Sequence, residues 1–129
     1  MSFLLDTHVF LWALNDRHRL SSSVVNILTN PQEAMFFSAA SSWEIAIKWS
    51  KGHIKLPDNP SVSIPDATTT AGLTQLPITL RDSCHVADLP FHHRDPFDRL
   101  LIAQAMLKGL TIITADPIFK KYDIDLFWD

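Results

Sequence analysis

The feature that most constrains the fold is the alternation of short apolar runs with longer helix-like stretches along the chain. The apolar runs predict strands at residues 3–5, 34–38, 73–78, 111–114 and 126–128. Apolar periodicity, capping residues and stop signals predict helices over 7–14, 21–29, 41–52, 79–87 and 96–108. Strands that alternate with helices favour a parallel sheet with helices on both faces and right-handed crossovers. The sequence therefore predicts an α/β fold with a central, mostly parallel sheet.

Residues 57–72 fit this pattern least well. Pro57, Pro60 and Pro65 interrupt the helical period, and the run of threonines at 68–70 has low helix propensity. We expect one short helix in this region and no more.

Composition limits the setting and the partners. A chain of 129 residues with 47% hydrophobic content predicts a single domain over residues 1–129. Cys84 is the only cysteine, which is typical of a reducing compartment. No secretory signal or 18-residue apolar run is visible, so we expect a cytoplasmic protein without a membrane segment. The net charge of −3 excludes nucleic-acid binding by a basic surface alone, and a polyanionic partner would need bound cations or a local basic patch.

Four acidic residues follow the predicted strands or lie in the first turn of a helix. They are Asp6, Glu44, Asp98 and Asp116. In an open parallel sheet, the carboxyl ends of the strands meet at one edge, where ligands bind. We therefore expect the four carboxylates to face one rim.

Helix capping is the alternative explanation for each acid taken alone. Asp6 can cap the helix at 7–14, and Glu44 can complete a capping box with Ser41. In the segment HRDPFDRLLIAQA, Asp95 fits an N-cap, Pro96 the first helical position and Asp98 the third. Asp116, which precedes a proline, can cap a short turn.

Capping does not explain four acids at one rim. Like charges about 6 Å apart repel by roughly 3 kcal/mol per pair at an effective dielectric near 20. A hard divalent cation offsets that repulsion, and Mg²⁺ and Mn²⁺ prefer carboxylate oxygen ligands. Without a cation, the repulsion should raise at least one carboxyl pKa above its usual value.

Four segments of the chain resemble the motifs of PIN-domain ribonucleases, and most closely those of the VapC-type toxins. The segments are LLDTHVFLW, SAASSWEIAIK, HRDPFDRLLIAQA and TIITADPIFKKY, and they span nearly the whole chain. The resemblance implies an α/β/α sandwich and Mg²⁺- or Mn²⁺-dependent endoribonuclease activity with one or two ions. It also implies an RNA substrate, a homodimer and inhibition by a small antitoxin protein.

By motif position, the resemblance assigns Asp6, Glu44, Asp98 and Asp116 as catalytic and metal-binding residues. The flanking candidates are expected to orient these ligands or to touch the substrate; they are Thr7, His8, Asp95 and Arg99. Residues 57–72 depart from the clean amphipathic helix that the family pattern predicts there.

Two other functions compete with the nuclease interpretation. A phosphatase of the haloacid-dehalogenase type also places an aspartate after its first strand, but it needs a second aspartate where His8 stands. A non-catalytic RNA- or protein-binding module with the same fold would have no need to keep all four acids.

Several other side chains have simpler explanations than a direct role. A zinc site at His92 and His93 is disfavoured because zinc sites need three or four suitably spaced ligands. Arg99, Lys48 and Lys51 could meet RNA phosphates, and solvation is the simpler explanation for the two lysines. The large apolar side chains on the first and third helices exceed what one small core needs and predict a homodimer and a groove for an antitoxin segment; they are Val9, Trp12, Trp43 and Trp49. Trp128, like these tryptophans, could instead stack on bases.

Overall fold

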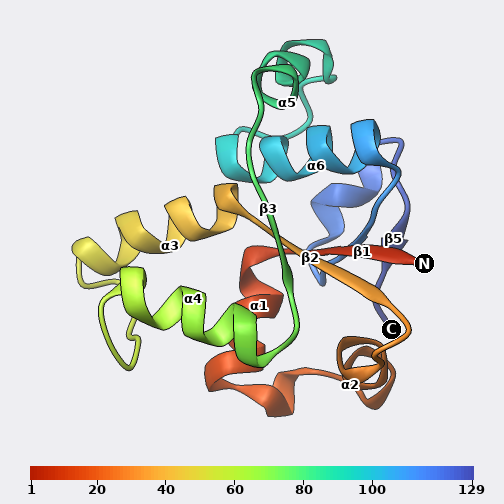
Figure 1. Ribbon diagram of the computed structural model, residues 1–129. Helices are drawn as coiled ribbons and strands as arrows, with labels where there is room; N and C mark the ends of the chain where they lie inside the picture. The colour runs from red at the N-terminus through yellow and green to blue at the C-terminus, as the bar shows by residue number, and fades with distance from the viewer.

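A computed structural model describes residues 1–129 and centres on a five-stranded sheet with strand order β3-β2-β1-β4-β5 (Figure 1). Every pair of neighbouring strands is parallel. The strands are β1 (Ser2–Leu5), β2 (Ala34–Ser38), β3 (Thr74–Leu76), β4 (Thr111–Ile113) and β5 (Leu126–Phe127). The predicted α/β class with a parallel sheet is confirmed.

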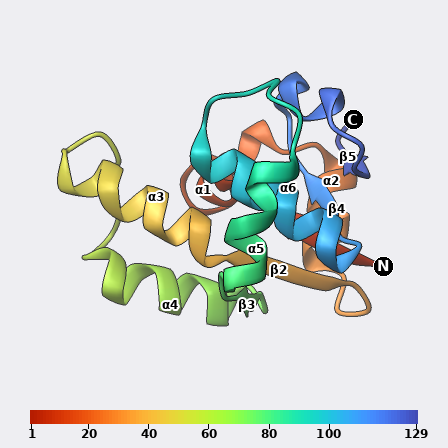
Figure 2. The same ribbon diagram turned by 90° about the horizontal axis from the view of Figure 1, so that it is seen from above.

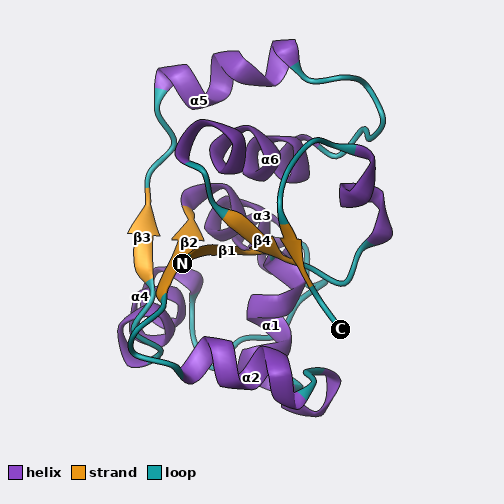
Figure 3. Ribbon diagram, turned by 90° about the vertical axis from the view of Figure 1, so that its right-hand side faces the viewer, coloured by secondary structure: helices purple, strands orange, loops and turns teal.

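Helices cover both faces of this sheet, which gives the predicted three layers (Figure 3). Helices α1 and α2 lie on one face, and α5 and α6 lie on the other. The helices are α1 (Thr7–Asn15), α2 (Ser22–Thr29), α3 (Ala39–Ser50), α4 (Pro60–Thr70), α5 (Leu80–His85) and α6 (Pro96–Lys108), with short 3-10 turns η1 (Arg17–Arg19), η2 (Val86–Asp88) and η3 (Pro117–Lys121). None of them combines the length and apolar character that a membrane span requires.

Successive side chains of the strands point to opposite faces of the sheet and pack into two hydrophobic cores. Leu4 and Ile112 point towards α6 and pack with Leu101 and Ile102. Their neighbours Leu5 and Ile113 point the other way, into the core beneath α1 and α2. Both faces of the central strands are buried, which explains why these strands read as continuous apolar runs.

Helix α3 begins directly at the end of β2, without a connecting loop. Ser38 is the last strand residue and also the N-cap, and its Oγ accepts a hydrogen bond from the Ala40 amide at 3.0 Å. The predicted start at Ser41, with Glu44 completing a capping box, is therefore wrong. The earlier start places Glu44 in the second turn of α3, where it is buried against the sheet edge.

Residues 60–70 form a helix longer than the short one predicted. The Asn59 side chain caps α4 by accepting from the Ser61 amide at 3.0 Å, and Pro60 occupies the first turn, where its missing N–H costs nothing. Pro65 lies inside the helix, and the Thr68 hydroxyl donates to its carbonyl at 2.9 Å. Burial of Ile64 and Thr68 outweighs the poor propensity of this stretch, and α4 lies beside α3 (Figure 2).

Candidate metal centre

Three acids from separate segments gather at the carboxyl edge of the sheet. Asp6 follows β1, Glu44 lies in α3 and Asp98 lies in the first turn of α6. Asp6 and Glu44 are each 3% exposed. The charge of Glu44 raises the pKa of both Asp6 and Asp98, so the three carboxylates act on one another as the topology predicts.

Asp6 is held by the neighbouring strand and does not cap α1. Its carboxylate makes no capping hydrogen bond, although the residue occupies the N-cap position. Instead, the Thr114 hydroxyl donates to Asp6 Oδ2 at 2.7 Å. Burial raises the pKa of Asp6, while the hydrogen bond from Thr114 opposes that rise. The capping explanation for Asp6 is wrong.

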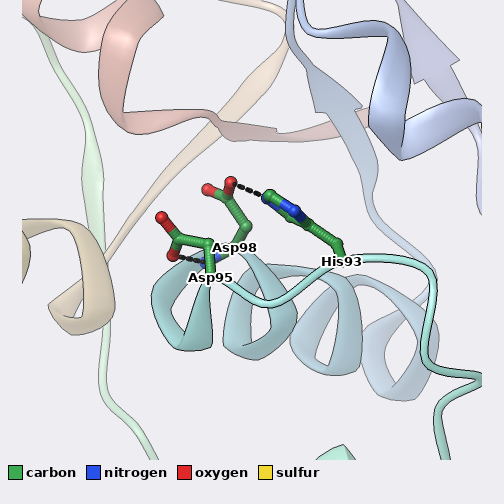
Figure 4. A group of neighbouring side chains, drawn as sticks. All are labelled: His93, Asp95 and Asp98. Carbon is green, nitrogen blue, oxygen red and sulfur yellow. Dashed lines mark hydrogen bonds and ion pairs between the residues drawn. The ribbon is translucent and has the colours of Figure 1, made fainter.

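The two acids at the start of α6 have different roles. Asp95 is the N-cap, as predicted, and its Oδ1 accepts from the Phe97 and Asp98 amides at 2.9 and 3.0 Å. Asp98 does not complete a capping box, because its Oδ2 pairs with His93 Nε2 at 2.8 Å (Figure 4). Burial, aided by repulsion from Asp6, raises the pKa of Asp98 to about 7, and the bond to His93 opposes this.

Glu44 carries the one buried side-chain oxygen of the molecule that lacks a partner. Its Oε2 accepts from Lys48 Nζ at 2.7 Å, whereas Oε1 is buried without a hydrogen bond. The hydrogen bond to Glu44 raises the pKa of Lys48, and the charges of Asp95 and Asp98 add to the effect. Lys48 is thus not simply a solvated lysine.

A hard divalent cation fits this donor set. A buried polar atom without a partner costs about 1–3 kcal/mol, and more when it is charged. Glu44 Oε1 therefore needs a positive partner that the protein does not supply. Burial raises the pKa of Asp6 and of Asp98 more than the hydrogen bonds from Thr114 and His93 lower it, so a nearby cation would also favour these two carboxylates in their charged form. Carboxylate oxygens at such a place are the ligands that Mg²⁺ and Mn²⁺ prefer.

Asp116 follows β4 at the same edge but is not drawn into this cluster. It is exposed, and its Oδ1 caps η3 by accepting from the Ile118 amide at 3.0 Å. Its backbone amide donates to Thr114 Oγ1 at 3.1 Å, and Thr114 in turn holds Asp6. In this structure Asp116 is the cap of a 3-10 turn, and its role as a metal ligand stays a prediction.

Two flanking candidates near Asp6 occupy different surroundings. Thr7 is buried, and its hydroxyl donates to Ser41 Oγ at 2.8 Å rather than to Asp6. His8 is exposed, and its charge lowers the pKa of Asp6. Thr7 therefore joins α1 to α3, while His8 remains free to meet a substrate at the rim.

Arg99 does not face solvent, as a phosphate contact would require. It is 5% exposed, and its guanidinium donates to the carbonyls of Val86 and Pro90 at 3.0 Å each. It also donates to the Tyr122 hydroxyl at 3.2 Å. These bonds fix the loop that leads to His93, so Arg99 supports the site from behind.

Thr114 is a site residue that the strand and motif patterns did not single out, and His93 was considered only as a disfavoured zinc ligand. Thr114 ends the apolar run TIIT two residues before Asp116, a position where a polar residue was the only signal. His93, Asp95 and Asp98 offer ligand atoms within 4.8 Å of one another. The neighbouring His92 packs edge-on against the Tyr122 ring, 5.2 Å between centroids, and is not part of this group.

Comparison with known protein families and structures points to one family. The PIN domain family model matches residues 3–125. A chain of the VapBC2 complex from Rickettsia felis, solved on a DNA fragment from its promoter, superposes with a TM-score of 0.77 at 17% identity over 100% of both chains. A chain of VapBC-1 from nontypeable Haemophilus influenzae gives 0.66 at 16% identity, over 98% of this chain and 97% of that one.

A third similar structure is a chain of FitAcB from Neisseria gonorrhoeae, with a TM-score of 0.63 at 20% identity over 98% and 96% of the two chains. No curated protein gives a significant sequence match. The structural likenesses establish the fold, and the family model, which covers almost the entire chain, goes further. Both agree with the resemblance read from the four motifs: the chain belongs to the PIN domain family.

Proposed function

We propose that this protein is a divalent-metal-dependent endoribonuclease that acts as the toxin of a type II toxin–antitoxin pair. The observation that carries the proposal is the cluster of Asp6, Glu44 and Asp98, which is buried, mutually repelling and contains an orphaned oxygen. A fold gains no stability from such a cluster unless a cation completes it. Membership of the PIN family supports a nuclease over a phosphatase or an inert binding module.

The three acids would hold one or two Mg²⁺ or Mn²⁺ ions, with Asp116 as a fourth ligand once it leaves its capping bond. When bound, a divalent cation lowers the pKa of a water molecule and neutralises charge on the phosphate. Glu44 would hold a second ion or orient that water. Thr114 keeps the Asp6 carboxylate aimed at the rim.

Residues around the acids would contact the RNA. Lys48 Nζ lies at the rim with its side chain 40% exposed, so it can meet a phosphate without leaving Glu44. Trp43 is 56% exposed and packs edge-on against Phe97, with ring centroids 5.1 Å apart. This aromatic pair flanks the acids and offers a face on which a base can stack.

The test is cleavage of a structured RNA by the purified protein with Mg²⁺ or Mn²⁺. We expect EDTA to abolish cleavage, and Asp98→Asn to slow it by about a hundredfold or more. Asp66→Asn is the matched control, since Asp66 is exposed on α4 and distant from the cluster in the chain. Equal rates for Asp98→Asn and the parent protein would falsify the site, and equal cleavage of DNA would overturn the RNA assignment.

The partner would be a small antitoxin bound to a homodimer. Three similar structures are those of VapBC2, VapBC-1 and FitAcB, and the first of them is bound to a DNA fragment from its promoter. A groove of about 820 Å³ between α3 and α4 is lined in part by Trp43, Trp49 and Ile64. Val9 is fully buried and adds nothing to such a surface, which corrects one part of the sequence argument. Trp12 packs on Trp128, with ring centroids 5.9 Å apart.

Co-expression with the product of the neighbouring gene tests this partner. A complex that co-purifies and suppresses RNA cleavage is the expected result. Light scattering of the protein alone should give twice the chain mass at tens of micromolar. A monomer under those conditions would contradict the homodimer.

A further inference from the structure

His93 lies where a ligand of the proposed cation should lie. Its Nε2 is 2.8 Å from Asp98 Oδ2, and the ring is aimed at that carboxylate (Figure 4). Adjacent ligands of an octahedral ion, each about 2.1 Å from the metal, are themselves about 3 Å apart. The His93–Asp98 separation therefore already matches that of two neighbouring ligands on one ion.

The imidazole is presented by a loop that is fixed from beneath. The Arg99 guanidinium binds the carbonyls of Val86 and Pro90 and reaches the His93 carbonyl at 3.5 Å. The His93 side chain is 24% exposed and that of Asp98 is 14% exposed, so the imidazole is more open to solvent than the carboxylate that it contacts.

A second observation indicates that a cation belongs beside His93. Glu44 Oε1 is buried without a partner, and the charge of Glu44 acts directly on Asp98, the residue that His93 contacts. Asp95 Oδ1 accepts from two backbone amides, and the group His93, Asp95 and Asp98 still offers one ligand atom from each residue within 4.8 Å of the others. Within this group, His93 and Asp98 contact each other directly.

We propose that His93 Nε2 is a direct ligand of the bound cation, next to Asp98, and that this nitrogen makes the site select a transition metal such as Mn²⁺ over Mg²⁺. Carboxylate and water oxygens suit both Mg²⁺ and Mn²⁺, whereas an added imidazole nitrogen favours first-row transition metals, Mn²⁺ among them, over Mg²⁺. The inference rests on the proposed cation site and adds one ligand and a metal preference to it.

Pulsed electron paramagnetic resonance of the Mn²⁺-loaded protein tests the ligand directly. A coordinated imidazole gives ¹⁴N modulation, which should disappear when the protein carries ¹⁵N-labelled histidine. His93→Gln should abolish the modulation, because the amide can still hydrogen-bond to Asp98 but has no imidazole nitrogen. His92→Gln is the matched control and should retain it, because His92 packs on Tyr122 instead.

Affinity measurements by titration calorimetry complete the test. His93→Gln should weaken Mn²⁺ binding by about tenfold or more, and Mg²⁺ binding by less than about threefold. Mn²⁺ that binds without histidine ¹⁴N modulation would overturn the ligand role and leave the proposed nuclease intact. Equal loss of Mn²⁺ and Mg²⁺ affinity would overturn the selectivity. Failure of the parent protein to bind either ion would overturn the proposed function together with this inference.

Discussion

Helix α6 carries two buried polar sites with opposite characters. At its start, Asp98 belongs to the acid cluster and has a pKa of about 7. Further along, Gln104 contacts Asp82 of α5 at 3.1 Å. Burial raises the pKa of Asp82, but hydrogen bonds from Thr79 and Gln104 outweigh it and lower that pKa below its usual value.

The difference lies in how completely each carboxylate is bonded. Asp82 Oδ2 accepts from the Thr79 amide and from Gln104, while Thr79 Oγ1 accepts from the Asp82 amide to complete a capping box. Gln104 in turn accepts from the Ser38 hydroxyl, so the network joins α5, α6 and β2. The acid cluster has no such closure, since Glu44 Oε1 stays unpaired. A carboxylate that serves the fold has its hydrogen-bond partners within the protein, whereas a carboxylate that serves a ligand keeps an oxygen without a partner.

The largest expected effect on stability comes from Asp82, the carboxylate whose hydrogen bonds are complete. Asp82→Ala removes the carboxylate that accepts from the buried Gln104 amide and from the Thr79 backbone amide, and it breaks the side-chain half of the capping box, so it should lower the free energy of unfolding by about 3 kcal/mol. The melting temperature should then fall by roughly 10 °C. Cleavage per folded molecule should not change. Asp82→Asn keeps an acceptor oxygen and should lose less, and an unchanged melting temperature for Asp82→Ala would erase the contrast between the two sites.

The pH dependence should have opposite signs at the two sites. Because the native pKa of Asp98 is raised, the metal-free native state binds more protons than the unfolded state between about pH 4 and pH 7. Stability should therefore fall as pH rises through that window. The lowered pKa of Asp82 contributes stability that is present above about pH 4 and is lost only at more acidic pH.

Asp98→Asn tests this sign directly. In EDTA at pH 7.5, the variant should melt roughly 5 °C above the parent protein, because a desolvated and repelled charge is gone. The difference should shrink at pH 5, and Mn²⁺ should stabilise the parent more than the variant. Thermal melts at both pH values provide the measurement. If the variant melts at a lower temperature than the parent in EDTA, then the charged Asp98 stabilises the fold and the predicted sign is wrong.

The smallest expected effect comes from Thr114, which bonds a carboxylate of the unsatisfied site. Thr114→Val keeps the side-chain shape but removes the hydroxyl that donates to Asp6. Loss of such an orienting bond should weaken Mn²⁺ binding by about tenfold and change stability by about 1 kcal/mol or less. Thr111→Val is the control, since Thr111 is buried at the other end of β4. Calorimetry that finds equal Mn²⁺ affinity in both variants would show that Asp6 needs no support.

Local signals in the sequence were enough for the strands, for most helices and for some caps. The N-cap role of Asp95 was predicted from residue type and position, and its bonds to the backbone confirm it. The convergence of Asp6, Glu44 and Asp98 followed from topology alone, because parallel strands end at one edge. That rule needs only the order of elements, which apolar periodicity reveals.

Contacts between distant segments were beyond local signals. Arg99 resembles a phosphate contact in the sequence, and it is buried only because residues 86–93 fold back over it. His93 reaches Asp98 across the helix N-cap, a separation that is not a helical repeat. The start of α3 was misplaced because SAASS offers several possible caps, and the register of β2 against β1 decides among them.

The seamless join between β2 and α3 limits where this protein can change in length. Each residue added to a helix turns the positions after it by about 100°. A single insertion between Ser38 and Glu44 would therefore swing the glutamate out of the cluster while leaving the composition of the helix almost unchanged. The segment 51–59, between α3 and α4, has no such constraint on the acids. Insertions and deletions compatible with activity should accumulate there, and a deletion scan across residues 38–59 should change from intolerant to tolerant where α3 ends.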